Sequence, residues 1–179
     1  MRKSTIAKLV VIALVATAAV LIPLRARQPH PVALGDPAPA FTLPSLSQRN
    51  ISLSQFHGAV VILNFWATWC PPCVEETPSL EKFAAEMRRR GAVVIGVSVD
   101  DDGTALTKFV KTYHLTYHIA RDPNRALAAR YGTFKFPETY IIDRDGRVAE
   151  KIIGPTDWSD PRMTTFVRAL IGNGPVSER

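Results

Sequence analysis

Apolar residues along this chain form blocks whose spacing alternates between strand and helix patterns. Continuous apolar runs at 60–66 and 92–99 are typical of strands that are buried on both faces. Each run is followed by apolar residues at helical spacing, at 71–90 and at 104–113. This order of strand and helix predicts an α/β domain.

The segments on either side of this centre complete the predicted sheet. Residues 41–43 and 51–53 alternate apolar and polar positions around a turn-rich stretch, which predicts an N-terminal β-hairpin. Beyond residue 113 the pattern predicts, in order, a strand at 117–120, a helix that begins at Pro123 and stops at Gly132, strands at 139–142 and 148–153 around a glycine turn, and a helix at 163–171. The fold class is therefore α/β, with a mixed sheet flanked by helices on both faces.

The N-terminal segment 1–27 has the pattern of an export signal or membrane anchor. Residues 9–24 are uncharged and mostly apolar, and they follow Arg2, Lys3 and Lys8. Sixteen helical residues span about 24 Å, slightly less than the ~30 Å hydrocarbon core, and flanking residues extend the run. We expect an uncleaved single-pass anchor in the cytoplasmic membrane, with the basic end in the cytoplasm and the domain outside. Cleavage after a small-x-small site is the alternative.

The remainder of the chain divides into three parts. Residues 28–40 contain four prolines, which predict a stiff, extended linker. Residues 41–172 form the predicted domain, and the polar residues 173–179 form a tail.

The formal charge of +6 does not indicate a nucleic-acid-binding protein. Five of the 22 basic residues and none of the 16 acidic residues lie in 1–27, so the rest of the chain is nearly neutral. The one acidic run, Asp100 to Asp102, precedes a predicted helix. We interpret these three acids as helix-start residues, with a divalent-ion site as the alternative.

The chain has two cysteines, Cys70 and Cys73, directly after the apolar run at 60–66. If Pro71 and Pro72 open a helix, Cys70 occupies its N-cap, where free backbone N–H groups and the helix dipole favour a thiolate. Cys73 then lies one turn further in and is harder to reach. We interpret the pair as a redox-active dithiol and disulfide, with Cys70 attacking and Cys73 resolving, and no other cofactor is expected.

Two other uses of the cysteine pair are less consistent with the sequence. A zinc site needs about four ligands, but there is no second cysteine pair and the four histidines lack zinc-finger spacing. A structural bridge across so short a loop restricts the unfolded chain only weakly in the loop-entropy account.

Three motifs together resemble the thioredoxin superfamily, and in particular its membrane-anchored extracytoplasmic thiol-disulfide oxidoreductases of the TlpA, ResA and CcmG type. They are the lead-in at 34–41, the active-site stretch at 63–73 and Phe136-Pro137-Glu138-Thr139. The stretch between Val99 and Phe136 is longer than in plain thioredoxin by about one helix and one strand, which is the central insertion expected of this group.

The resemblance implies roles for several residues. Pro137 is expected to be a cis-proline that faces the cysteines, and the backbone of Phe136 is expected to pair with a bound substrate strand. Trp69 and Pro71 are expected to complete the substrate-binding surface. Glu76 matches an acidic residue near the cysteines and is expected to exchange a proton with Cys73.

One departure from the family pattern and one alternative interpretation bear on Glu76. Thioredoxin has a buried aspartate at the position of Asn64, which does not titrate. Glu75 and Glu76 together also fit the alternative of surface acids in the first turn of a helix.

By this resemblance we expect an extracytoplasmic thiol-disulfide oxidoreductase, acting as a monomer and as a reductase in cytochrome c maturation. Its expected partners are disulfide-containing clients such as apocytochrome c and a membrane electron donor of the DsbD or CcdA type. The alternatives are a thiol peroxidase, or a client-holding or copper-binding module that draws a ligand from His114 or His118.

Overall fold

The computed structural model describes residues 31–47 and 49–172. The chain divides into two compact units, Met1–His30 and Pro31–Arg179, and only the second contains described residues. The predicted anchor and the polar tail at 173–179 therefore lie outside the described residues. Within the described ranges, no helix is both long enough and apolar enough to span a membrane.

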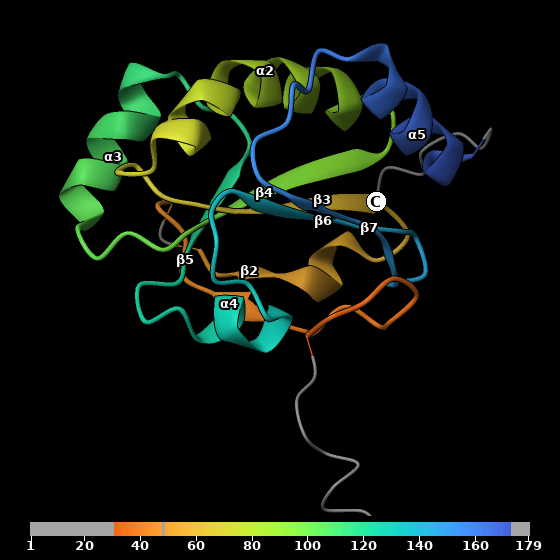
Figure 1. Cartoon of the computed structure of the whole chain (residues 1–179), viewed down its shortest axis with the longest axis horizontal. Coiled ribbons are helices and arrows are strands. Elements are labelled where there is room, and N and C mark those ends of the chain that lie inside the picture. The colour runs from red at the N-terminus through yellow and green to blue at the C-terminus, as the bar shows by residue number, and fades with distance from the viewer. Residues whose placement is uncertain (1–30, 48, 173–179) are drawn as a thin grey trace, which may run out of the picture. The chain divides into compact units, whose positions relative to one another are not determined.

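A five-stranded mixed sheet forms the centre of the second unit (Figure 1), in the order β5-β4-β3-β6-β7. Strands β3, β4 and β5 are parallel, and β6 and β7 run antiparallel to their neighbours. Their bounds are Val60–Trp66 for β3, Ala92–Ser98 for β4, His118–Arg121 for β5, Glu138–Ile142 for β6 and Val148–Ile153 for β7. All seven residues of β3 are buried, as expected of a central strand covered on both faces.

Helices cover both faces of this sheet. In Figure 1, α2, α3 and α5 lie on one side, and α4 lies on the other side with β1, β2 and the 3-10 helix η1. Their bounds are Pro71–Arg88 for α2, Gly103–Thr112 for α3, Ala126–Tyr131 for α4, Pro161–Ile171 for α5 and Leu53–Phe56 for η1. The mixed sheet flanked by helices and the predicted N-terminal hairpin are thus confirmed, and α3 with β5 forms the expected central insertion.

The helix α2 packs on β4 through a single buried face. Its buried residues recur at helical spacing, and they are Cys73, Glu76, Thr77, Leu80, Phe83, Ala84 and Met87. The face of α2 that packs on the sheet therefore carries Cys73 and Glu76 together with the apolar residues that hold the helix there.

The described part of the predicted linker belongs to the folded unit. Strand β1 (Thr42–Leu43) pairs antiparallel with β2 (Ile51–Ser52), as predicted. Upstream of them, the N–H groups of Val32 and Gly35 donate hydrogen bonds to the carbonyls of Tyr131 and Val148. The prolines of this segment have no backbone N–H to donate, but the residues between them form hydrogen bonds to the domain. Residues 31–40 are therefore not a free spacer.

The prediction that a helix begins at Pro123 is wrong, because α4 begins at Ala126. The carboxylate of Asp122 accepts hydrogen bonds of 2.9 Å from the N–H groups of Leu127 and Ala128, and this holds the start of the helix further along the chain. The N-cap residue, Arg125, adopts a left-handed conformation with φ of 54°. The predicted stop at Gly132 is confirmed, since Gly132 is the left-handed C-cap.

Candidate active site

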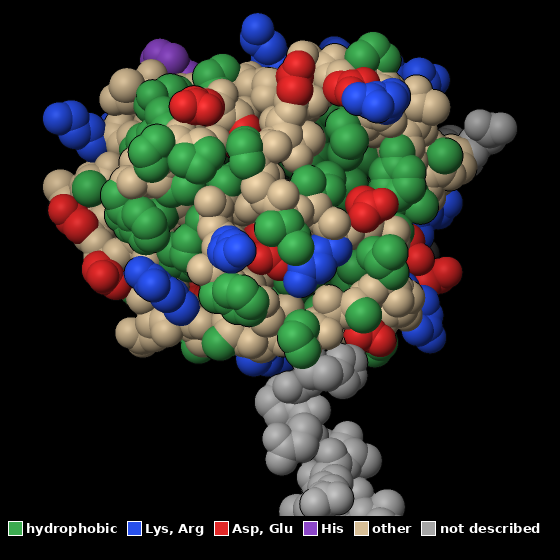
Figure 2. All heavy atoms as spheres, viewed as in Figure 1, with side chains coloured by type: hydrophobic (Ala, Val, Ile, Leu, Met, Phe, Trp, Pro, Cys, Tyr) green, Lys and Arg blue, Asp and Glu red, His purple; other side chains and the backbone are tan. Residues whose placement is uncertain are grey.

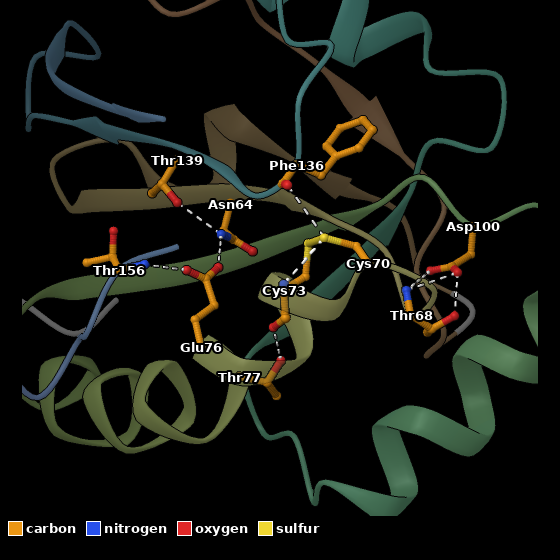
Figure 3. Close-up of a disulfide and its surroundings, with 10 residues drawn as sticks. All are labelled: Asn64, Thr68, Cys70, Cys73, Glu76, Thr77, Asp100, Phe136, Thr139 and Thr156. Carbon is orange, nitrogen blue, oxygen red and sulfur yellow. Dashed lines mark hydrogen bonds between the residues drawn. A yellow bond between two sulfur atoms is a disulfide. The ribbon is translucent and has the colours of Figure 1, made fainter. Parts of the chain in front are cut away.

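Cys70 and Cys73 form a disulfide at the N-terminal end of α2 (Figure 3). Cys70 is the N-cap residue, Pro71 and Pro72 begin the helix, and the backbone N–H of Cys73 donates a 3.3 Å hydrogen bond to Cys70 Sγ. Prolines are tolerated in this first turn because its N–H groups have no partner within the helix. The predicted placement of both cysteines is confirmed.

The two sulfurs differ in their surroundings. Cys73 is 1% exposed and lies on the buried face of α2, whereas Cys70 is 5% exposed. Cys70 Sγ lies 3.5 Å from the carbonyl oxygen of Phe136, on the loop that enters β6. Both cysteines are therefore buried in the oxidised pair, Cys70 slightly less than Cys73, and the Phe136 backbone faces Cys70.

The loop that faces the disulfide contains the cis peptide bond that we predicted between Phe136 and Pro137. Pro137 is buried and Phe136 is half-buried. The carbonyl of Pro137 accepts a 2.9 Å hydrogen bond from the N–H of Gly154, so the residue that follows β7 is tied to this loop.

An aromatic surface lies next to the disulfide. The Trp69 side chain is 57% exposed and meets the Phe136 ring edge-on, with 6.2 Å between ring centroids. The guanidinium of Arg125 lies 5.8 Å from the Trp69 ring centroid. Figure 2 shows apolar side chains gathered on the side of the domain where α2 begins. An exposed indole beside a reactive disulfide is suited to contact a client protein.

Glu76 is buried, with 5% of its surface exposed, whereas its neighbour Glu75 is exposed. The Glu76 carboxylate accepts hydrogen bonds of 2.9 Å from Asn64 Nδ2 and 3.0 Å from the backbone N–H of Thr156 (Figure 3). Burial raises the pKa of Glu76 to about 6, although these donors lower it in part. The alternative of two surface acids is therefore wrong for Glu76, and a carboxylate with this pKa can exchange a proton near neutral pH.

Asp100 is a site-supporting residue that the sequence analysis did not identify. It is 2% exposed, and its carboxylate accepts hydrogen bonds from both the N–H and the hydroxyl of Thr68, at 3.1 and 2.6 Å. Thr68 belongs to the turn that carries the chain into Cys70. One sequence signal was available, because Asp100 follows β4 closely and parallel strands end at the same edge of a sheet.

The prediction that all three acids at 100–102 start a helix is correct only for Asp102. Its carboxylate caps α3 by accepting hydrogen bonds from the N–H groups of Thr104 and Ala105. These donors, the Ala105 N–H above all, lower the pKa of Asp102. Asp100 instead turns inward to the Thr68 turn.

The residues considered for metal binding are not brought together. Among the described residues, no group of three or more His, Cys, Asp or Glu side chains is placed to hold a metal ion. The His118 ring packs against Phe56, with 5.1 Å between centroids. Neither the divalent-ion alternative nor a copper site at His118 has support in this geometry.

Comparison with known proteins decides the family. Residues 34–151 match the AhpC/TSA family. The chain belongs to the AhpC/TSA family. The match runs from the segment before β1 to most of β7, and it includes the disulfide and the Phe136–Pro137 loop.

Two relatives within this wider group are thiol-disulfide oxidoreductases by name. The chain is 36% identical over 121 residues to the thiol-disulfide oxidoreductase ResA of Bacillus cereus, covering 68% of this chain and 70% of the relative. It is 35% identical over 127 residues to the thiol:disulfide interchange protein DsbE of Pseudomonas aeruginosa, covering 69% and 68%.

Solved structures of the same class share the fold. A thiol:disulfide interchange protein of the thioredoxin family from Chlorobium tepidum superposes with a TM-score of 0.69 at 27% identity, covering 78% of this chain and 99% of that one. A secreted Mycobacterium tuberculosis disulfide oxidoreductase, homologous to Escherichia coli DsbE, has a TM-score of 0.62 at 27% identity, with 72% and 94% covered. This AhpC/TSA family member is a thiol-disulfide oxidoreductase of the ResA and DsbE type.

Proposed function

We propose that this protein reduces disulfides in client proteins outside the cytoplasmic membrane, with apocytochrome c as the client class. The Cys70 thiolate attacks a client sulfur, so the client disulfide breaks and a Cys70–client mixed disulfide forms. The Cys73 thiolate then attacks Cys70 Sγ. The Cys70–Cys73 disulfide forms, and the client leaves with both of its sulfurs reduced.

Glu76 is the proposed proton acceptor in the second step. Cys73 must lose its proton before it attacks, because the thiolate is the nucleophile. Glu76 lies one helical turn beyond Cys73 on the same buried face of α2. Its raised pKa, about 6, leaves it mostly ionised at neutral pH yet able to take up a proton.

The observation that carries the proposal is the arrangement of the disulfide. Cys70 caps α2 and faces the Phe136 carbonyl, while Cys73 is covered on the buried face of the helix. A sulfur at the helix N-cap beside the half-buried Phe136 suits attack on a client, and a sulfur further inside the helix suits resolution. In the proposal, Phe136 and Pro137 hold an extended client strand, and Trp69 and Pro71 border it.

The compartment and the partners rest on the sequence and the relatives. Residues 1–27 would tether the domain to the membrane, and the Mycobacterium tuberculosis relative is described as secreted. An exported reductase must receive electrons from outside its own compartment, because such compartments favour disulfides. We propose a membrane electron donor of the DsbD or CcdA type, no nucleic-acid partner, and a monomeric protein.

The deciding experiment uses Cys73→Ser in the full-length chain, expressed in its own host. This variant should accumulate a mixed disulfide between Cys70 and its client, identified by mass spectrometry after purification without reductant. Cys70→Ser is the matched control and should trap nothing. If the trapped proteins include no apocytochrome c, the proposed client class is wrong, whereas equal trapping by both variants would overturn the roles of the two cysteines.

In vitro turnover tests the direction and the alternatives. The reduced wild-type protein should reduce insulin in the presence of a dithiol, and Cys70→Ser should abolish this turnover. A thiol peroxidase would instead consume peroxide, at a rate comparable to the rate of insulin reduction expected here. A copper-binding module would bind Cu(I) tightly with little insulin turnover.

A further inference from the structure

The loop between β7 and α5, residues 154–158, borders the carboxylate of Glu76. In Figure 1 it leads from the end of β7 toward α5 on the side of the sheet that α2 covers. The backbone N–H of Thr156 donates the 3.0 Å hydrogen bond to Glu76 Oε2, and the N–H of Trp158 donates a 3.3 Å hydrogen bond to Ser79 Oγ. The 154–158 loop is thus tied to α2 at Glu76 and at the residue three positions later.

Trp158 brings a third hydrogen-bond donor to this place. Its side chain is 1% exposed and packs on Phe83 of α2, with 5.1 Å between ring centroids. The indole Nε1 is buried, and no acceptor in the described part of the chain meets hydrogen-bonding geometry. The same N–H group nevertheless contributes, after Thr156 and Asn64, to lowering the pKa of Glu76. Trp158 thus brings a buried donor without a partner to the loop that holds the Glu76 carboxylate through Thr156.

A buried donor without an acceptor is unfavourable, because it has lost its hydrogen bond to water. Such a donor gains most when a nearby group becomes negatively charged, because hydrogen bonds to ionised acceptors are stronger than those to neutral ones. The ionised carboxylate of Glu76 is the group placed to provide this.

A shallow hollow lies between α2 and the same loop. Glu76, Pro78 and Lys82 of α2 line it together with Pro155 and Asp157. Glu76 thus borders this hollow as well as the buried face of α2.

We propose that Trp158 is a positioning residue for the proton acceptor: its buried indole N–H, which has no partner among the described residues, becomes a third donor when the Glu76 carboxylate is ionised, and together with the N–H of Thr156 it then holds that carboxylate for the proton of Cys73. The inference rests on the proposed role of Glu76, and it adds the partner that controls when Glu76 is ionised. Removing the indole N–H should raise the pKa of Glu76 further, because the ionised form loses a donor.

Other titratable groups around Glu76 must be separated from this effect. Glu75 and Lys82 of α2 and Asp157 of the loop border the hollow, and Cys73 titrates only after reduction. Tyr117, before β5, also senses the charge of Glu76, but burial raises its pKa so far that it stays neutral in any working range. Experiments on the oxidised protein exclude the thiols, and Glu76→Gln identifies the contribution of Glu76.

The first test uses the oxidised wild-type protein. The chain has three tryptophans, so its ¹⁵N–¹H spectrum contains three indole N–H resonances to follow from pH 4.5 to 8. The Trp158 resonance should move with a midpoint near 6, and this movement should disappear in Glu76→Gln. A Trp158 resonance that does not respond to Glu76 ionisation overturns the inference, and this result requires no variant of Trp158.

The second test uses Trp158→Phe, which removes the N–H and keeps an aromatic ring against Phe83. The titration midpoint of the Glu76 carboxyl carbon in the oxidised protein should rise by roughly half to one pH unit. Trp66→Phe is the matched control, because Trp66 also has a buried indole N–H without an acceptor among the described residues but packs on Phe109. It should leave the Glu76 midpoint unchanged. An equal midpoint in wild type and Trp158→Phe overturns the inference.

The kinetic consequence separates this inference from the proposed function. The rate at which Cys73 releases a model mixed disulfide should show the Glu76 midpoint in its pH profile, and Trp158→Phe should move that midpoint upward by the same amount. If Glu76→Gln leaves the rate profile unchanged, the proton-acceptor role is wrong. In that case the titration of the Glu76 carboxyl group would still show whether the Trp158 indole N–H lowers the pKa of Glu76.

Discussion

Asn64 in β3 donates a 2.9 Å hydrogen bond to the carboxylate of Glu76 in α2, and both residues are buried. The same amide nitrogen donates a second 2.9 Å hydrogen bond to Thr139 Oγ1 in β6. Asn64 therefore joins the proposed proton acceptor to two strands of the sheet. Because Asn64 carries no charge, Glu76 titrates here without a second carboxylate beside it.

We expect the stability of the oxidised protein to fall as the pH rises through the range in which Glu76 ionises. The pKa of Glu76 is about 6 in the fold and 4.5 for an unperturbed carboxyl, so the folded state binds the proton more tightly than the unfolded state. This contribution is fully present below pH 4.5 and is lost by about pH 6, with a size of about 2 kcal/mol at most. Urea unfolding at several pH values measures it.

Glu76→Gln should remove this pH dependence between 4.5 and 6. Glu75→Gln is the matched control, because Glu75 is the exposed neighbour on the same helix turn, and it should leave the slope unchanged. If the free energy of unfolding of Glu76→Gln still changed with pH as in the wild type, another group would be responsible for the pH dependence.

In the reduced protein, Cys70 should react with iodoacetamide at least about ten times faster than Cys73 at pH 7. Cys70 is the helix N-cap, where the helix dipole favours a thiolate, and Cys73 lies on the buried face of α2. Mass spectrometry of peptides after short labelling times measures both rates. Labelling of Cys73 before Cys70 would contradict the proposed order of attack and resolution.

Trp69→Ala should weaken client binding without affecting the fold. The side chain is more than half exposed, so its removal should change the free energy of unfolding by less than about 0.5 kcal/mol. KM for a protein client should rise several-fold, while the rate with a small disulfide such as oxidised glutathione should hardly change. Ile153→Ser, at an exposed apolar position in β7, is the control and should alter neither value.

Asp100→Asn should destabilise the protein by about 1–3 kcal/mol, because the buried carboxylate holds Thr68 through charge-assisted hydrogen bonds. It should also slow client reduction, since the turn that precedes Cys70 loses its anchor. Asp101→Asn changes an exposed neighbour and should be close to neutral in chemical denaturation. Equal stability of the two variants would show that the Thr68 contacts contribute little.

The sequence by itself determined the strands and the place of the cysteines, and its resemblance to a known family implied the cis-proline. The bounds of β3, Val60–Trp66, follow from one continuous apolar run. The Cys70 N-cap follows from its spacing to two prolines. Periodicity, capping and spacing are properties of neighbouring residues, so they can be read without knowing what packs against them.

Only the tertiary structure decided which of several similar residues belong to the site. Glu75 and Glu76 are equivalent in sequence, and so are Asp100 and Asp101, yet one member of each pair is buried. Burial depends on the segment that covers a residue, and the donor from Thr156 comes from 80 positions beyond Glu76. The acidity of Glu76 is thus a property of the assembled fold, because desolvation and distant donors act only after the chain has packed.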